Sequence, residues 1–142
     1  QRQNVGATRV AGFEVEAETT FRRLYLSTGY LFADSRVVEF AADPTLVGLR
    51  VPQVARHQLT FQGRYSLEKW TLALQGRAAG KQYDDDQNLF RLEPFLQIDL
   101  FASRRISKNA SVFAALENAT NTRYSTGRTP IRTVSSPINF QA

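Results

Sequence analysis

The sequence predicts an all-β protein: an antiparallel up-and-down meander that forms part of the wall of a transmembrane β-barrel. Three observations lead to this fold class. Apolar and polar residues alternate along several segments, as they do in a strand with two unlike faces. These segments hold about ten residues or more, whereas the strands of globular sheets usually hold about five or six. The connections between the segments alternate between short and long along the chain.

The first predicted strand, residues 8–21, shows the clearest alternation. Apolar residues such as Phe13, Val15 and Phe21 share one face. A helix would distribute the intervening glutamates around its circumference, whereas a strand places them together on the other face. Those glutamates are Glu14, Glu16 and Glu18. We therefore expect a strand with an acidic stripe on its polar face.

Residues 56–66 form the strand around which the neighbouring segments are organised. Pro52 lacks a backbone N–H, so the strand is expected to begin after it. From His57 onward, apolar positions that include Phe61 and Tyr65 alternate with polar ones. The same design recurs in four further predicted strands, which are residues 24–38, 70–81, 95–106 and 111–118. In residues 24–38 both faces are apolar in the first half, so the sequence predicts the strand but not which of its faces is the apolar one of the sheet. Residues 138–140 are predicted to begin a last strand.

The connections support a membrane barrel over a soluble sheet. The short ones are residues 22–23, 67–69 and 107–110, and the long ones are residues 39–55, 83–93 and 121–137. In an antiparallel meander this order places every short turn at one end and every long loop at the other, as in transmembrane barrels. A strand crosses a bilayer at a tilt with roughly 9–11 residues. A soluble antiparallel β-sandwich or a lipocalin-like binding module would also explain the alternation, but not the strand lengths.

Composition excludes several classes of site and partner. The 142 residues contain 18 Lys and Arg, 13 Asp and Glu, and no cysteine, for a formal net charge of +5. Without cysteine, the chain has no disulfide, thiolate nucleophile or cysteine-ligated metal. The arginines are spread along the chain and carry no nucleic-acid-binding motif, so we expect no nucleic-acid partner. No apolar run reaches the roughly 18–20 residues of a membrane helix.

One long connection carries the densest cluster of oxygen-bearing side chains. Calcium favours such ligands, but adjacent aspartates cannot all point at one ion, and no spaced ligand loop is present. We therefore predict no metal site and no cofactor. The cluster is either a strand end exposed to solvent, with no further role, or a loop that contacts the substrate. The candidate substrate contacts are Tyr83, Asp84, Asp85, Asp86, Gln87 and Asn88.

The sequence contains no recognisable catalytic constellation. His57 is the sole histidine, and no serine or cysteine nucleophile context surrounds it. Glu14, Glu16 and Glu18 suggest the paired carboxylates of glycoside cleavage, but three glutamates on one strand face are more simply explained as a lumen stripe. We predict that the protein is not an enzyme.

Aromatic and basic residues gather where a membrane barrel would meet its two interfaces. Four aromatic residues near predicted strand ends are candidates for an aromatic girdle, although ordinary core packing explains them equally well. They are Phe21, Tyr65, Trp70 and Phe95. The arginines near the long loops are candidates to meet lipopolysaccharide, and a plain solvated rim is the alternative. They are Arg50, Arg56, Arg91, Arg123, Arg128 and Arg132.

Several short sequence motifs, in their order along the chain, resemble the C-terminal barrel of TonB-dependent outer-membrane receptors. They are Gly29-Tyr30 followed by Asp34-Ser35, Gly48 leading into residues 51–57, Arg77 with residues 80–88, and residues 113–121 followed by Tyr124 and residues 128–130. Together they cover about the last 120 residues.

The resemblance implies that residues 1–142 are the C-terminal part of a receptor barrel of about 22 strands with a plugged lumen. The plug domain, the TonB box and the final strand are expected to be absent from this stretch. Such receptors sit in the bacterial outer membrane, where lipid and lipopolysaccharide surround them. They import a scarce nutrient of the siderophore, cobalamin or saccharide class, using energy relayed by the TonB complex.

Overall fold

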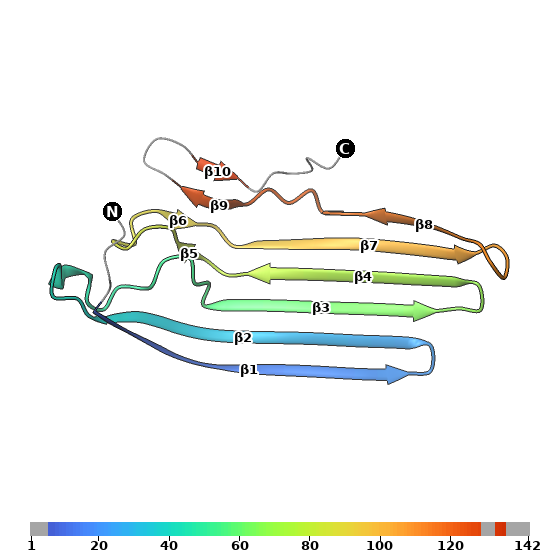
Figure 1. The fold of residues 1–142 in the computed structure, drawn as a ribbon, viewed down its shortest axis with the longest axis horizontal. Helices are drawn as coiled ribbons and strands as arrows, with labels where there is room; N and C mark the ends of the chain where they lie inside the picture. Colours follow the sequence, from blue (N-terminus) through green and yellow to red (C-terminus); the bar gives the residue numbers. More distant parts are fainter. Residues whose placement is uncertain (1–5, 129–132, 136–142) are drawn as a thin grey trace.

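Six long antiparallel strands form one continuous sheet in the computed structural model, which describes residues 6–128 and 133–135. Within these residues the strand order is β1-β2-β3-β4-β7-β8, so each strand pairs with its neighbour along the sheet (Figure 1). The strands are β1 (Ala7–Phe21), β2 (Leu24–Glu39), β3 (His57–Ser66), β4 (Trp70–Ala79), β7 (Phe95–Arg105) and β8 (Ser111–Leu116). All six predicted strands are confirmed, with ends that differ by one or two residues. In the described part of the chain, no helix is long and apolar enough to cross a membrane.

The register of the sheet settles which side chains share a face. Residues directly opposite one another in an antiparallel pair point to the same side. Phe13 pairs with Phe32, which pairs with His57. Glu18 pairs with Ser27, and the same row continues to Asp99 on β7. The sheet therefore has one apolar face, and its other face is polar across β1 to β7; β2, whose facing the sequence left open, joins this pattern.

The long connections contain short elements of their own, and they all lie at one end of the sheet (Figure 1). The connection between β4 and β7 folds into a small hairpin of β5 (Gln82–Tyr83) and β6 (Arg91–Leu92). The last connection contains β9 (Ser125–Arg128) and β10 (Thr133–Ser135), which pair with each other. The predicted strand start at residues 138–140 lies outside the described residues.

The core of buried apolar side chains lies where the end of β2 meets the loop that follows it, not between two sheets. Val37, Phe40 and Leu46 form a small buried cluster beside the 3₁₀ helix η1 (Pro44–Leu46). Asp43 caps η1, because its Oδ1 accepts a hydrogen bond of 3.1 Å from the Thr45 amide. The other sheets among the described residues are two-stranded hairpins, so no second layer covers the long strands. A soluble sandwich, which needs two packed sheets, is therefore not favoured.

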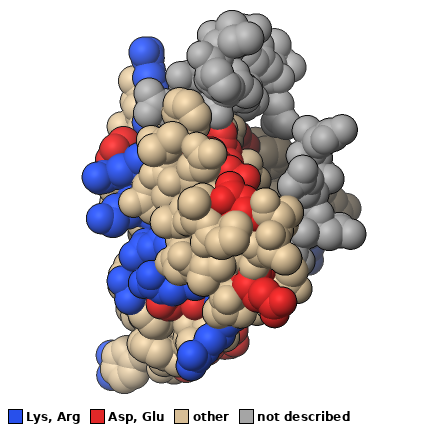
Figure 2. Space-filling view, turned by 90° about the vertical axis from the view of Figure 1, so that its left-hand side faces the viewer, with Lys and Arg blue, Asp and Glu red and all other residues tan. Residues whose placement is uncertain are grey.

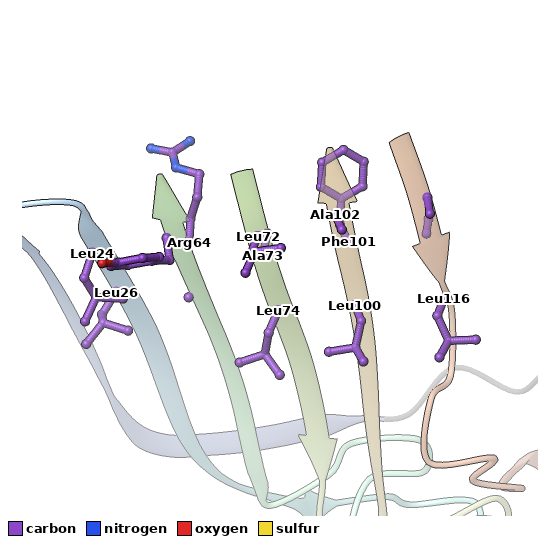
Figure 3. A pocket seen from close by; sticks show the side chains of 14 residues that line it. Leu24, Leu26, Arg64, Leu72, Ala73, Leu74, Leu100, Phe101, Ala102 and Leu116 are labelled. Atoms are coloured by element: carbon purple, nitrogen blue, oxygen red, sulfur yellow. The ribbon is translucent and has the colours of Figure 1, made fainter. Parts of the chain in front are cut away.

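The apolar face is uncovered and carries large side chains. Leucines from β2, β4, β7 and β8 lie side by side around a shallow hollow of about 580 Å³ on this face (Figure 3). Apolar residues exposed here include Phe13, Val15, Leu26, Leu72, Leu74, Leu96 and Leu100. An exposed apolar surface of this extent is typical of a membrane or protein interface. This arrangement is the one expected of a barrel wall that faces lipid.

Three of the four candidate girdle aromatics lie on the apolar face. Phe21, Tyr65 and Trp70 are exposed there at the short-turn end, and the Arg104 guanidinium lies 5.2 Å from the Trp70 ring centroid. Phe95 does not belong to this group. It pairs with Ala79 on the polar face, where its ring stacks on Tyr124 with centroids 3.9 Å apart.

A glycine on the apolar face is covered by an aromatic ring, which leads to a testable prediction. A Cβ at Gly76 would overlap the ring of Phe61 on the neighbouring strand. We expect Gly76→Ala to lower the free energy of unfolding in detergent micelles by about 1 kcal/mol, because the ring must leave its preferred rotamer. In a Phe61→Ala background the same change should cost nothing, so a double-mutant cycle measures the contact. Equal costs in both backgrounds would contradict it.

Candidate ligand-facing surface

The polar face of the sheet is built from two neighbouring rows that cross five strands. The alternation of each strand directs these side chains away from the apolar face. The row nearer the loops is Glu16, Gly29, Thr60, Arg77 and Gln97, and the next row is Glu18, Ser27, Gln62, Gln75 and Asp99. Glu16 and Glu18 of the predicted acidic stripe lie in these rows, and Glu14 lies on the same face in the next row toward the loops. Between β2 and β7 they border a cavity of about 330 Å³.

Arg77 is the centre of a polar network at the loop end of this face. Its Nη2 donates hydrogen bonds to the Tyr124 hydroxyl at 2.6 Å and to Gln97 Oε1 at 3.1 Å. The guanidinium also lies 5.6 Å from the ring centroid of Phe95. Arg77 is thus held by an amide, a hydroxyl and an aromatic ring. None of these partners cancels its positive charge.

Asp99 connects β7 to the segment that follows β8. Its Oδ1 accepts hydrogen bonds from the Asn118 amide at 2.7 Å and from Gln97 Nε2 at 3.1 Å. Asn118 in turn closes the next turn, because its Oδ1 accepts a hydrogen bond from the Thr122 amide at 2.9 Å. Thr122 Oγ1 donates to the carbonyl of Leu96 at 2.7 Å. These bonds fix the approach to Tyr124 and therefore one side of the Arg77 network.

The structure places the candidate substrate contacts in the β5–β6 hairpin, with Tyr83 at the end of β5 and residues 84–88 in the turn. Two of them maintain the hairpin itself. The carboxylate of Asp85 accepts hydrogen bonds from the amides of Leu89 at 3.0 Å and Phe90 at 2.7 Å. Asn88, at φ 58°, donates from Nδ2 to the Arg50 carbonyl at 3.0 Å and accepts at Oδ1 from the Arg50 amide at 2.9 Å. These two side chains act as scaffold.

Of the remaining candidates, Tyr83 and Asp84 contact a neighbouring loop, and Asp86 and Gln87 are exposed. Gln53 joins its loop to the hairpin: its amide donates to the Tyr83 carbonyl at 2.7 Å, and its Nε2 donates to Asp84 Oδ1 at 2.8 Å. Asp86 and Gln87 lie exposed at the tip of the hairpin. Of the six candidates, these two are therefore the best placed to meet a ligand from outside.

Sequence reasoning did not single out Tyr124 as a site residue. It lies 47 residues from Arg77 along the chain, and the contact between them depends on how the segment after β8 folds back. The segment after β8 shows no alternation of apolar and polar residues, so the sequence does not predict its path. The only signal for Tyr124 was its place in a motif that resembles the receptor family. His57, in contrast, lies on the apolar face, where its Nδ1 is 2.7 Å from the hydroxyl of Tyr30.

The chemistry available on the polar face is hydrogen bonding and charge complementarity. In residues 6–128 and 133–135, no group of three or more His, Cys, Asp or Glu side chains is arranged to hold a metal ion. Arg77 supplies guanidinium donors, and the amides of Gln75 and Gln97 supply both donors and acceptors. Such a surface can bind a polar molecule or a polar protein segment.

Comparisons with known proteins agree with this architecture. A model of the family described as TonB dependent receptor-like, beta-barrel, matches residues 1–119. A search of curated protein sequences finds no match.

Solved structures resemble the chain in fold at low sequence identity. The siderophore receptor PiuA from Acinetobacter baumannii aligns with a TM-score of 0.81 and 20% identity, over 91% of this chain and 20% of PiuA. The ferric yersiniabactin uptake receptor FyuA from Yersinia pestis aligns at 0.78 and 19% identity, over 90% of this chain and 21% of FyuA. The ferric-catecholate import receptor Fiu from E. coli K12 aligns at 0.75 and 16% identity, over 91% of this chain and 19% of Fiu.

The chain spans about a fifth of the length of these receptors. Its six-stranded sheet, with an apolar face, a polar face and the long loops at one end, has the organisation of a transmembrane barrel wall. The family match over residues 1–119 agrees with that organisation, and the chain belongs to the TonB-dependent receptor-like β-barrel family.

Proposed function

We propose that this chain is part of the barrel wall and extracellular loops of a bacterial outer-membrane receptor that takes up a scarce nutrient with energy from the TonB complex. The observation that carries the proposal is the two-faced sheet: an uncovered apolar face for lipid, and a polar face for the lumen. The plug and the segment that contacts TonB belong, in this proposal, to other parts of the receptor.

A ferric siderophore is the substrate class that the comparisons support best, ahead of cobalamin or a saccharide. The similar solved structures are described as siderophore, ferric yersiniabactin and ferric-catecholate receptors. Many iron chelates are anionic and rich in oxygen acceptors, to which the guanidinium of Arg77 and the neighbouring amides are complementary. We place ligand contact at the hairpin tip, Asp86 and Gln87, and at the Arg77 network.

Uptake by cells tests this function. The receptor that contains this chain, produced in a bacterium without its own siderophore receptors, should accumulate radiolabelled ferric chelate only when TonB is present. A parallel assay with labelled cobalamin and an oligosaccharide separates the substrate classes. Uptake of either of these in place of iron would contradict the siderophore assignment, and uptake that is independent of TonB would contradict the transport mechanism.

Two variants of the β5–β6 hairpin distinguish a residue that contacts the ligand from one that maintains the structure of the hairpin. Gln87→Ala is expected to weaken chelate binding to whole cells by about three- to tenfold, because one exposed hydrogen-bonding group is lost. Asp85→Ala should weaken binding and also increase cleavage of the hairpin by protease, because two backbone amides lose their acceptor. Glu68→Ala, at the short-turn end, is the matched control and should change neither. An unchanged affinity in Gln87→Ala would remove the hairpin tip from the binding site.

A further inference from the structure

The long loop between β2 and β3 turns back along the end of β2 before it reaches β3. Arg50 in this loop forms an isolated antiparallel bridge with Arg36 of β2. Next to the bridge, the Val51 amide donates a hydrogen bond to the Ser35 carbonyl at 3.2 Å. Backbone pairing of this kind is that of an antiparallel strand. Residues 50–51 are therefore fixed to the sheet, although they belong to a loop.

The side chain of Asn88 joins the β5–β6 hairpin to this fixed part of the loop. Its Oδ1 accepts a hydrogen bond from the Arg50 amide at 2.9 Å, and its Nδ2 donates to the Arg50 carbonyl at 3.0 Å. In a hydrogen-bonded pair of an antiparallel sheet, one residue likewise uses both its N–H and its carbonyl toward one partner. The amide of Asn88 therefore takes the place of a neighbouring strand. Both residues are half-buried, so water competes weakly for these bonds.

A second contact attaches the other end of the hairpin turn. The Gln53 amide donates to the Tyr83 carbonyl at 2.7 Å, and Gln53 Nε2 donates to Asp84 Oδ1 at 2.8 Å. We call the bonds that Asn88 and Gln53 form between the two loops the loop latch. The exposed tip of the hairpin, residues 86–87, lies between the two points of attachment. The latch therefore fixes the tip from both sides.

The charges of the two loops favour the same contact. The hairpin turn contains Asp84, Asp85 and Asp86, whereas Arg50 and its bridge partner Arg36 lie on the other side of the latch. Figure 2 views the loop end and shows Lys and Arg gathered along one side of the molecule, while most of the visible Asp and Glu lie toward the other. Opposite charges attract, so the electrostatic interaction between the loops adds to the hydrogen bonds of the latch.

We propose that Asn88 is a positioning residue: through the loop latch it makes the β2–β3 loop and the β5–β6 hairpin move as one unit, and it holds the tip where the ligand is bound. This inference rests on the proposed function, which places ligand contact at Asp86 and Gln87. It adds that the contact at the tip is formed before the ligand arrives.

Asn88→Gly in the receptor that contains this chain tests the positioning role. Glycine keeps the left-handed backbone at φ 58° but removes both bonds to Arg50. A tip that occupies its binding position for only part of the time binds more weakly in proportion. We therefore expect the affinity for the radiolabelled ferric chelate of the uptake assay to fall about fivefold. Asn121→Gly, at a left-handed position with φ 49° outside the latch, is the matched control and should not change the affinity.

Hydrogen exchange at Gln53 distinguishes a latch from a local support of the hairpin. The Gln53 amide donates to the Tyr83 carbonyl, so Asn88 is not its partner. Loops that move as one unit separate together, and Asn88→Gly should therefore raise the exchange rate of the Gln53 amide as well as that of Arg50. Faster exchange at Arg50 alone would overturn the proposal.

A disulfide across the latch supplies an independent test. The chain contains no cysteine, and the side chains of Gln53 and Asp84 are in contact, so Gln53→Cys with Asp84→Cys introduces one reducible bond between the loops. The oxidised receptor should take up the chelate as well as the same receptor after reduction, because the loops need not separate. In an Asn88→Gly background, oxidation should restore the affinity about fivefold. Uptake that the disulfide blocks, or affinity that oxidation does not restore, would contradict the latch.

These measurements separate the latch from the function on which it rests. Chelate uptake that is absent, or independent of TonB, in the unsubstituted receptor would contradict the proposed function, while exchange at Gln53 would still decide whether the loops move together. TonB-dependent uptake with an equal affinity of the Asn88→Gly and unsubstituted receptors would overturn the positioning role alone.

Discussion

Gly12→Ala is expected to cause the largest loss of stability of any single substitution considered for this chain. At this position β1 passes so close to β2 that an added Cβ would overlap the carbonyl oxygen of Phe32. The obstacle is backbone and cannot rotate away, so the two strands must separate locally. We expect the free energy of unfolding in micelles to fall by about 3 kcal/mol, measured by denaturant titration of the tryptophan fluorescence.

Gly63→Ala provides the control for this prediction. Its added Cβ would meet only the Cδ2 atoms of Leu26 at 3.5 Å and Leu74 at 3.8 Å, which are ordinary contact distances. Both glycines lie inside long strands, so the general cost or gain of replacing glycine in a strand applies to each. Similar effects of the two substitutions would show that the close approach at Gly12 does not matter.

The second large effect is expected for Asp99→Ala. This change removes the acceptor for the Asn118 amide at 2.7 Å and for Gln97 Nε2 at 3.1 Å. We expect the free energy of unfolding to fall by about 2 kcal/mol, because a backbone donor loses a charged acceptor. Since Asn118 closes the turn that leads to Tyr124, the segment after β8 should also become more accessible to protease.

Asp99→Asn separates the loss of the hydrogen-bond acceptor from the loss of the negative charge. The amide oxygen still accepts from Asn118, while the charge is lost, so this variant should keep most of the protection of residues 118–124. Hydrogen exchange of the Asn118 and Thr122 amides measures that protection directly. Equal exchange in Asp99→Ala and in the unsubstituted chain would show that Asp99 does not hold this segment.

The long strands could be predicted from the sequence because each has enough residues to display its period. β1 alternates clearly from Phe13 to Phe21, and the short turns after Phe21 and Ser66 interrupt the pattern. Strands of two residues, such as β5 and β6, are too short to show any period, and hydrogen bonds such as those of Asp85 determine them instead.

The sequence could predict the face of a site residue only where the alternation of that residue's own strand determines it. The alternation of β4 and of β7 is enough to place Arg77 and Gln97 on the polar face. The same alternation places Phe95 on the face of Gln97, so of the two interpretations left open for this residue, packing on the polar face holds and the girdle does not. The neighbourhood of Arg9, Arg36 and Arg50 could not be predicted, because these residues meet through a register between distant segments.

The strand order has a consequence for assembly of the wall. Among the described residues, each long strand pairs with the next long strand along the chain, and the insertion between β4 and β7 folds upon itself as β5 and β6. Contacts between near neighbours in sequence require little loop-closure entropy and form quickly. The wall can therefore grow one hairpin at a time, with each completed strand as the template for the next.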